Sequence, residues 1–201
     1  MIKRLVMLML ALGVAACAGQ PAAMPEPDSA AQVEIFPRDA NPEFEGPRGD
    51  LFSVHLYRHA EKLTGTDPQL TELGHARARH LGEHLSRPSV AVSRVWSSPY
   101  QRTMQTALPL AQKLGLEIDI YDPRAQRDLV LALHESASDA AVFGHSNTIP
   151  ELAAMLCQCE VEAMPESEYE RGYVVVLGRG VSELYEVDMT RTWTDRPVPA
   201  D

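Results

Sequence analysis

The chain has 201 residues and a formal net charge of −10, with 23% charged and 45% hydrophobic residues. This length suits one domain with a proper core, and the composition is that of a globular protein rather than a disordered one. The acidic balance argues against a nucleic-acid partner, which would need a basic face, and any anion site must be built from local cations against the overall field.

Residues 1–16 form a predicted targeting segment. Lys3 and Arg4 make a positive start, and the apolar stretch over 5–14 is too short to span a bilayer as a mature helix. The segment ends in Val-Ala-Ala-Cys at Cys17, which resembles the bacterial lipobox. The alternative is an ordinary secretory signal in which Cys17 is incidental.

The lipobox resemblance implies that Cys17 becomes the lipidated first residue of the mature protein. More than one acyl chain on one residue gives stable anchoring, and the resemblance implies three. Since no Asp follows Cys17, lipoprotein sorting rules favour the outer membrane. We therefore expect a cell-envelope protein, lipid-anchored and facing the periplasm, with the lipid as its only membrane contact.

Residues 17–49 are rich in Pro, Ala, Glu and Asp and are expected to be a flexible tether, with a possible edge strand at 33–36. The folded domain is expected over 50–190, and 191–201 form a short C-terminal tail. The domain begins with an apolar, β-branched run over 51–57 that predicts a buried strand.

The remaining elements follow from periodicity, caps and turn residues. The first predicted helix begins at Thr71 and reaches 85 or 86. The second begins at Ser98 as N-cap, has Pro99 in its first turn and ends at Gly115. The third spans 127–134, and the fourth spans 148–156 behind a capping box of Thr148 and Glu151. Predicted strands span 93–96, 116–121, 140–143, 173–177 and 183–187. This alternation predicts an α/β fold, a three-layer α/β/α sandwich with a mostly parallel central sheet.

Three of the predicted strand ends carry related chemistry. Arg58 and His59 follow the first strand, Arg102 follows the second at a helix start, and His145 follows the 140–143 strand at another helix start. Carboxyl ends of strands in an open α/β sheet are where ligands bind, and helix N-termini favour anions. Arginine adds permanently charged donors that match phosphate oxygens.

These three blocks resemble the histidine phosphatase superfamily, which includes phosphoglycerate mutases and compact phosphohistidine phosphatases. The resemblance rests on Tyr-Arg-His-Ala-Glu at 57–61, Ser-Ser-Pro-Tyr-x-Arg-Thr-x-x-Thr-Ala at 97–107 and Gly-His-Ser-Asn at 144–147. It covers essentially the whole domain and implies a phosphoglycerate mutase-like fold of branch 1.

The resemblance implies that His59 is the nucleophile and becomes phosphorylated, while Arg58, Arg102 and His145 hold the phosphoryl group. Nearby arginines should keep His59 neutral, and His145 is expected to be protonated against phosphate oxygens. Asn147 is a candidate phosphate contact or a simple turn residue. No metal or cofactor is expected, because the cations stabilise the transferring group.

The chain departs from the family in two respects. Ala60 replaces the usual Gly, and Gly65 stands where mutase-like members have Asn, so mutase activity is not expected. Larger members carry a general acid on an insert after the third strand, and only 121–138 is available here. Asp122 is the first candidate and Glu61 the second, whereas compact phosphohistidine phosphatases lack such an acid.

The sequence holds two further patterns, one of histidines and one of cysteines. His80 and His84 fit an inverted zinc-protease motif, although Gly82 weakens the helix, and Arg77 on the histidine face suggests solvent. Cys157 and Cys159 are expected either to form a disulfide or to be two small buried thiols.

The leading hypothesis is a metal-independent phosphoric monoester hydrolase acting on small phosphomonoesters or phosphoramidates. The rival hypothesis is a catalytically weak lipoprotein of the same fold that only binds a phosphorylated ligand.

Overall fold

A computed structural model describes residues 50–189 of the chain. The expected signal peptide, the lipidation site Cys17, the whole tether with its possible edge strand at 33–36, and the C-terminal tail lie outside the described residues. Within residues 50–189 no helix combines the length and the hydropathy needed to cross a bilayer.

Six strands form one sheet in the order β3-β2-β4-β1-β5-β6. Four neighbouring strands are parallel to one another, and these are β1 (Phe52–Arg58), β4 (Ala140–Gly144), β2 (Arg94–Ser97) and the edge strand β3 (Ile118–Ile120). The final two, β5 (Arg171–Gly178) and β6 (Val181–Asp188), are antiparallel and extend one edge. The predicted mostly parallel sheet is therefore confirmed, with an antiparallel hairpin on one side.

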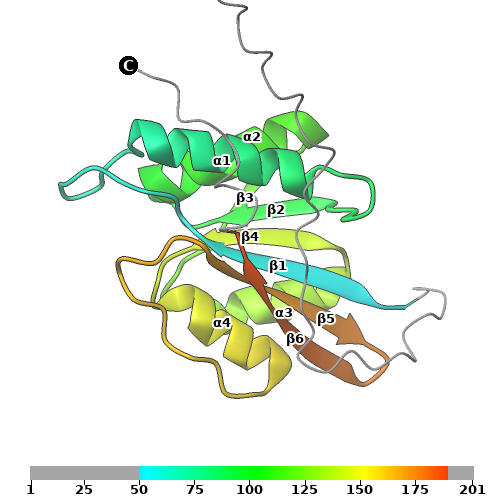
Figure 1. The fold of residues 1–201 in the computed structure, drawn as a ribbon. Helices are drawn as coiled ribbons and strands as arrows, with labels where there is room; N and C mark the ends of the chain where they lie inside the picture. Colours follow the sequence, from blue (N-terminus) through cyan, green and yellow to red (C-terminus); the bar gives the residue numbers. More distant parts are fainter. Residues whose placement is uncertain (1–49, 190–201) are drawn as a thin grey trace, which may run out of the picture. The chain divides into compact units, whose positions relative to one another are not determined.

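Helices cover both faces of this sheet, so the domain has the predicted three layers (Figure 1). Helices α1 (Glu72–Leu85) and α2 (Gln101–Leu114) lie on one face, and α3 (Gln126–Ser136) and α4 (Thr148–Cys157) lie on the other. Each face has its own apolar cluster. Strand β1 lies between them and is buried at every position, as its apolar run predicts.

The first helix begins and packs for reasons visible in the sequence. Thr71 is its N-cap, as predicted, and the Thr71 hydroxyl accepts a hydrogen bond from the Gly74 amide at 3.0 Å. Gly82 lies where α1 meets α2, and a Cβ at this position would be 2.9 Å from the Leu110 amide nitrogen. The glycine therefore permits a close backbone approach rather than merely weakening the helix.

Two predicted helix caps are wrong. Helix α2 begins at Gln101 with Tyr100 as its N-cap, so Ser98 and Pro99 precede the helix. The Ser98 hydroxyl is instead part of the polar network described below. Helix α4 has Asn147 at its N-cap position, and Thr148 is its first residue. No capping box forms there, because Glu151 accepts a hydrogen bond from Gln126 at 2.5 Å.

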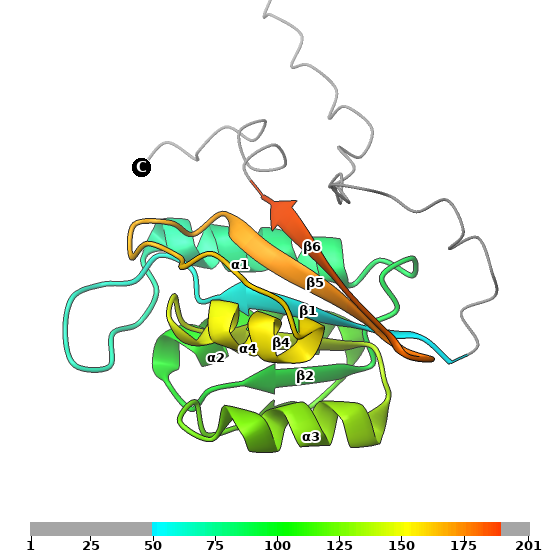
Figure 2. The same ribbon diagram turned by 90° about the horizontal axis from the view of Figure 1, so that it is seen from below.

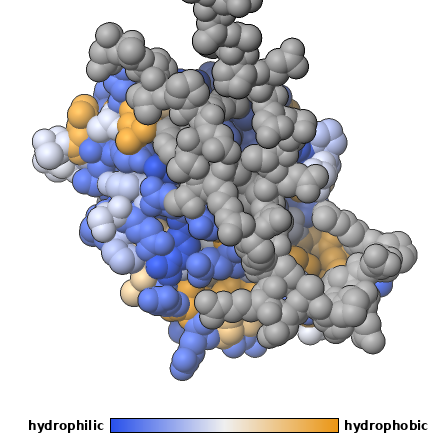
Figure 3. Space-filling model, viewed as in Figure 1, coloured by the Kyte–Doolittle hydropathy of each residue, from blue (hydrophilic) through white to orange (hydrophobic). Residues whose placement is uncertain are grey.

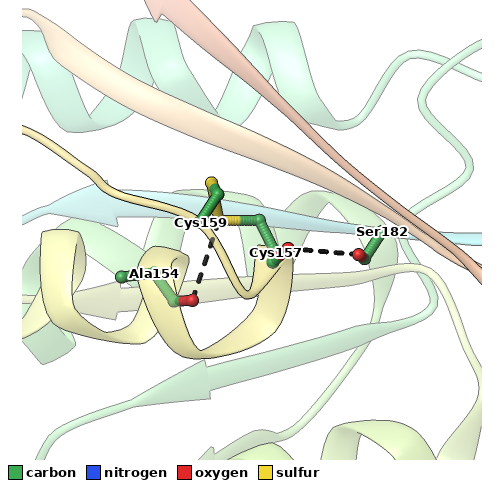
Figure 4. Close-up of a disulfide and its surroundings, with 4 residues drawn as sticks. All are labelled: Ala154, Cys157, Cys159 and Ser182. Atoms are coloured by element: carbon green, nitrogen blue, oxygen red, sulfur yellow. Dashed lines mark hydrogen bonds between the residues drawn. A yellow bond between two sulfur atoms is a disulfide. The ribbon is translucent and has the colours of Figure 1, made fainter.

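A disulfide joins Cys157 and Cys159 at the end of α4, which decides between the two expectations for these cysteines (Figure 4). The Ser182 hydroxyl donates to the Cys157 carbonyl at 3.1 Å and links this end of the helix to β6. The disulfide lies at the start of the loop 158–170, which leads to β5.

The surface of the domain is mostly hydrophilic. On the face seen in Figure 3, apolar residues stand in separate groups among hydrophilic ones. The side chains of Leu63, Ile120 and Leu131 are the most exposed large apolar ones of the described residues, and they belong to different segments of the chain.

Candidate active site

The parallel strands bring the three sequence blocks to one edge of the sheet. Arg58 at the end of β1 pairs in register with Gly144 of β4, and Ser97 at the end of β2 pairs with Phe143. The ends of these strands are therefore level, and β1 and β2 run in the same direction (Figure 2). The residues that follow them meet at this edge, as the topology of an open α/β sheet predicts.

His59 is held from both sides of its backbone. Its amide donates to the Gly144 carbonyl at 2.9 Å, and the next amide, that of Ala60, donates to the Thr106 hydroxyl at 3.0 Å. The ring nitrogen Nδ1 lies 2.8 Å from the Ala60 carbonyl oxygen. Because a carbonyl can only accept, Nδ1 carries the proton in the neutral ring, and Nε2 keeps its lone pair.

The His59 ring is neutral over the ordinary pH range. Burial lowers the pKa of His59 to about 3, and the charges of Arg58 and Arg102 lower it further. The expectation of a neutral histidine is met, but burial rather than the arginines is the main cause. The site therefore presents an unprotonated imidazole nitrogen, which can act as a nucleophile.

His145 lies close to His59, with 5.6 Å between the ring centroids. Arg102 Nη2 donates to His145 Nδ1 at 3.3 Å, so the ring proton is on Nε2, which donates to the Ser98 hydroxyl at 3.0 Å. Burial, followed by the charge of Arg102, lowers the pKa of His145 to about 4. His145 is thus neutral in the free protein, and its expected protonation against phosphate oxygens stays a prediction for the phosphate-bound state.

Arg102 reaches the site from the first turn of α2. Its guanidinium lies over the Tyr100 ring, 4.6 Å from the centroid, and its Nη1 is 3.6 Å from an Asp67 carboxylate oxygen. Arg102 Nε is buried and has no hydrogen-bond partner among the described residues. A buried donor of this kind is costly to leave unpaired, so the site favours an incoming acceptor.

Arg58 is more enclosed than a phosphate-binding residue was expected to be, because its side chain has no exposed surface. Its Nη1 donates to the Pro165 and Glu168 carbonyls at 3.1 and 2.7 Å. Its Nη2 donates to Glu166 at 3.0 Å, and its guanidinium lies 4.3 Å from the centroid of the Tyr169 ring. The loop before β5 therefore holds Arg58 in place.

A cavity of about 290 Å³ opens at this edge of the sheet. Its walls combine the expected residues with others, and they are formed by His59, Lys62, Tyr100, Arg102, Pro123, Arg124, His145, Ser146, Asn147, Thr148 and Glu166. Three of the four principal candidates line or adjoin it directly, and Arg58 lies behind Glu166. Lys62, expected to be a solvated loop charge, lines the cavity, and so does Asn147.

Neither candidate for the general acid lies where the reaction would need it. Asp122 is exposed and outside the cavity wall, and its carboxylate accepts from the Arg124 amide at 2.9 Å, which lowers the pKa of Asp122. Glu61 accepts from Arg77 through both of its oxygens, with a shortest distance of 2.6 Å. Both carboxylates are already engaged, so neither prediction is supported.

Sequence reasoning missed Glu166, the acidic side chain that does line the cavity. Its Oε2 accepts from Arg58, and its Oε1 accepts from the Ser146 hydroxyl. Glu166 lies 107 residues after His59 in a loop without a motif, so no local pattern could have identified it.

The zinc alternative finds no support in the described part of the chain, where no group of three or more potential ligand side chains gathers. Arg77 is buried and pairs with Glu61 and Glu170, so the expectation that this helix face meets solvent is wrong.

Comparison with known proteins agrees with this geometry. Residues 54–129 match the sequence model of the histidine phosphatase superfamily, branch 1. By this match the chain is similar to the histidine phosphatase superfamily. No curated protein sequence matches it significantly.

Solved structures of several phosphatases share the fold, which is phosphoglycerate mutase-like. The protein histidine phosphatase SixA, solved with tungstate, aligns with a TM-score of 0.58 and 21% identity over 70% of this chain and 99% of SixA. A mycobacterial glucosyl-3-phosphoglycerate phosphatase aligns at 0.52 and 16% identity, over 63% and 90%. A putative α-ribazole-5′-phosphate phosphatase from Escherichia coli aligns at 0.54 and 14% identity, over 68% and 96%.

Proposed function

We propose that this protein is a metal-independent phosphatase that hydrolyses small phosphorylated substrates through a phosphohistidine at His59. The observation that carries the proposal is a buried, neutral imidazole beside two arginines and a second histidine at one cavity. A neutral nitrogen can attack phosphorus in line and divide hydrolysis into two easier steps.

The protonation of His59 supports this role. Nδ1 donates to the Ala60 carbonyl, so Nε2 is the nitrogen that attacks and accepts the phosphoryl group. The imidazolium that forms keeps the same Nδ1 hydrogen bond, which opposes rotation of the ring during the reaction. The nucleophile is therefore preorganised rather than ordered by the substrate.

The cationic groups around His59 support the same proposal. The transferring phosphoryl group spreads negative charge over its equatorial oxygens, and fixed cations stabilise this charge. Arg102 supplies a permanent charge, and a bound phosphate would raise the pKa of His145 so that Nδ1 becomes a further donor. These cations offer the charge stabilisation that a metal ion supplies in other phosphatases.

The fold by itself does not choose the substrate, since structures that share it include a protein histidine phosphatase and a glucosyl-3-phosphoglycerate phosphatase. A rival proposal is a protein of the same fold that binds a phosphorylated ligand without turning it over. It predicts tight phosphate binding with no hydrolysis, whereas the phosphatase proposal predicts phosphate binding together with hydrolysis.

The decisive experiment compares the wild type with His59→Ala on 4-nitrophenyl phosphate in EDTA. We expect turnover by the wild type and a loss of at least about 1,000-fold in the variant, because the nucleophile is absent. Quenching in alkaline detergent should trap a phosphoenzyme, stable in alkali and labile in acid, only in the wild type. His75→Ala, on a helix away from the cavity, is the matched control. Full activity of His59→Ala would overturn the proposal.

We also propose, from the targeting segment alone, that Cys17 carries the lipid that anchors the domain in the outer membrane. Metabolic labelling with a fatty acid should mark the wild type and not Cys17→Ser. Equal labelling of both would contradict the anchor, and the result is independent of the catalytic proposal.

A further inference from the structure

Glu166 occupies a position that the mechanism described so far does not use. Its side chain lines the same cavity as His59, and 76% of its surface is exposed. One oxygen accepts from Arg58 Nη2 at 3.0 Å, and the other accepts from the Ser146 hydroxyl. A carboxylate thus lies on the arginine that a phosphoryl group would need.

We propose that Glu166 is the proton-transfer residue of the reaction at His59, giving a proton to the leaving oxygen and later taking one from water. This inference rests on the proposed function. It makes phosphomonoesters with poor leaving groups the substrate class, because their leaving oxygen must receive a proton from the enzyme. A phosphoramidate needs no such residue, since its leaving nitrogen is basic and can already carry a proton.

The competing carboxylates are excluded by their contacts. Glu61 is held by Arg77, and Asp122 is bonded to Arg124 and does not itself line the cavity. Among the residues that line the cavity, Glu166 is the one with a carboxyl group. It is therefore within the same enclosed space as the nucleophile, which is the first requirement for a general acid.

The contacts of Arg58 allow Glu166 to leave without disturbing the arginine. Arg58 Nη1 remains fixed by the Pro165 and Glu168 carbonyls, whereas Nη2 is held by the Glu166 carboxylate. A phosphate oxygen can replace this carboxylate on Nη2, since both are anionic acceptors. The exposed Glu166 side chain then lies beside the bound substrate instead of on Arg58.

Displacement changes the charge around Glu166. In the free protein five neighbouring groups face it, and these are Arg58 of β1, His59 and Lys62 after β1, and His145 and Ser146 before α4. The Ser146 hydrogen bond, followed by the charge of Arg58, lowers the pKa of Glu166 and keeps it ionised. A bound phosphate neutralises the cations and adds negative charge, so protonation of Glu166 becomes favourable.

The proton balance closes over one cycle. A substrate monoanion brings one proton, which passes to Glu166 on binding. His59 Nε2 then attacks phosphorus, the phosphorus–oxygen ester bond breaks, and the leaving oxygen takes the proton from Glu166. In the second step Glu166 takes a proton from the attacking water, the phosphorus–nitrogen bond breaks, and neutral His59 returns. Glu166 then gives this proton to the departing phosphate, which leaves as a monoanion, and is ionised again.

The test compares Glu166→Gln with the wild type on two aryl phosphates of similar shape, phenyl phosphate and 4-nitrophenyl phosphate. The quantity measured is kcat/KM, which reports the steps through cleavage of the ester. Glutamine keeps the size of the side chain and one accepting oxygen for Arg58 or Ser146, but it cannot exchange the proton. Glu160→Gln, in the same loop but outside the cavity wall, is the matched control.

We expect Glu166→Gln to lower kcat/KM about 100-fold for phenyl phosphate and less than about five-fold for 4-nitrophenyl phosphate, whose leaving group needs little protonation. Glu160→Gln should change neither value. An equal loss on both esters would overturn the inference, because a residue that only positions Arg58 affects both substrates alike.

A second readout separates this inference from the proposed function. If Glu166 activates water, the phosphoenzyme of Glu166→Gln should accumulate in a burst with 4-nitrophenyl phosphate, to a clearly higher level than the wild-type phosphoenzyme. Absence of any phosphoenzyme in the wild type would defeat the proposed function itself. A wild-type phosphoenzyme with no accumulation in the variant would defeat only the assigned role of Glu166.

Discussion

At the scale of single residues, the site is set by which atoms donate and which accept. The Ala60 carbonyl determines that His59 keeps its lone pair on Nε2, and Arg102, which can only donate, determines that His145 Nδ1 accepts. Ser98 completes this arrangement by accepting from His145 Nε2. Two neutral histidines with opposite tautomers therefore lie side by side, one prepared to attack and the other to receive a proton.

Arg102 gives the sharpest prediction at this scale. We expect Arg102→Lys to lower kcat/KM for 4-nitrophenyl phosphate by about 100-fold, because lysine cannot present the planar pair of donors that matches a phosphoryl group. Steady-state kinetics of the purified variant test this expectation. Arg127→Lys on the exposed side of α3 serves as the control, and equal activity of both variants would contradict the role of Arg102.

At the scale of elements, the close contact of α1 with α2 supports the site indirectly. Helix α2 carries Arg102 in its first turn, so its position relative to the sheet sets the position of the guanidinium. Gly82 allows α1 to approach the backbone of α2 near Pro109 and Leu110. The packing of two helices thus determines where a catalytic side chain lies.

We expect Gly82→Ala to destabilise the domain by about 1–2 kcal/mol even though alanine is the better helix former. The added Cβ would lie 2.9 Å from the Leu110 nitrogen and 3.0 Å from the Pro109 carbonyl carbon, and backbone atoms cannot yield as side chains can. Urea unfolding measures the change. Arg79→Ala, on the exposed face of α1, should change stability by less than about 0.5 kcal/mol. Greater stability of Gly82→Ala would refute the close contact.

The loop 158–170 is the other element on which the site depends. It begins at the Cys157–Cys159 disulfide, and its later part supplies the Pro165 and Glu168 carbonyls that hold Arg58. A segment without regular structure therefore fixes the most buried cation of the site. Without these carbonyls of the loop, the helices and strands around Arg58 would not fix the position of its guanidinium.

At the scale of the whole molecule, the chain is acidic while its site is cationic. With a net charge of −10, the protein as a whole repels anions, so local arginines and Lys62 must create the attraction. The acidic residues that neutralise these cations, such as Asp67 and Glu166, contact them directly. Attraction of a phosphorylated substrate therefore depends on the cavity and not on the surface.

Buried histidines make the stability of the folded domain depend on pH. The pKa of His59 is lowered to about 3, and those of His84 and His145 to about 4, mainly by burial. In the unfolded chain the pKa of histidine is about 6.5, so below this pH the unfolded state binds more protons than the folded state. The contribution of these neutral histidines to the free energy of unfolding is fully present above about pH 6.5 and is lost as the pH falls toward 4.

His84 tests this dependence without touching the site. We expect His84→Gln to reduce the loss of unfolding free energy between pH 6 and pH 4.5 by up to about 1.4 kcal/mol per pH unit. Urea unfolding at several pH values measures the slope. Leu73→Gln, an exposed position on the same helix, adds no titrating group and should leave the slope unchanged. An unaltered slope in His84→Gln would show that burial of His84 does not contribute.

Most of the fold and part of the site could be predicted from the sequence, because both depend on short-range patterns. Apolar runs and alternation located the strands and helices, and Thr71 and Gly115 marked helix ends through local hydrogen bonds and a left-handed conformation. Parallel strands then required Arg58, His59, Arg102 and His145 to meet at one edge. That step needs only the order of the elements.

What only the tertiary structure decided depends on contacts between distant segments. Ser98 bonds to His145 rather than capping a helix, Arg77 is buried against Glu61, and Glu166 lies on Arg58 from 108 residues away. The protonation of His59 and His145 belongs to the same class, because burial by the assembled domain lowers both pKa values. Sequence alone determined which groups meet, and packing determined which atoms they offer and in which charge state.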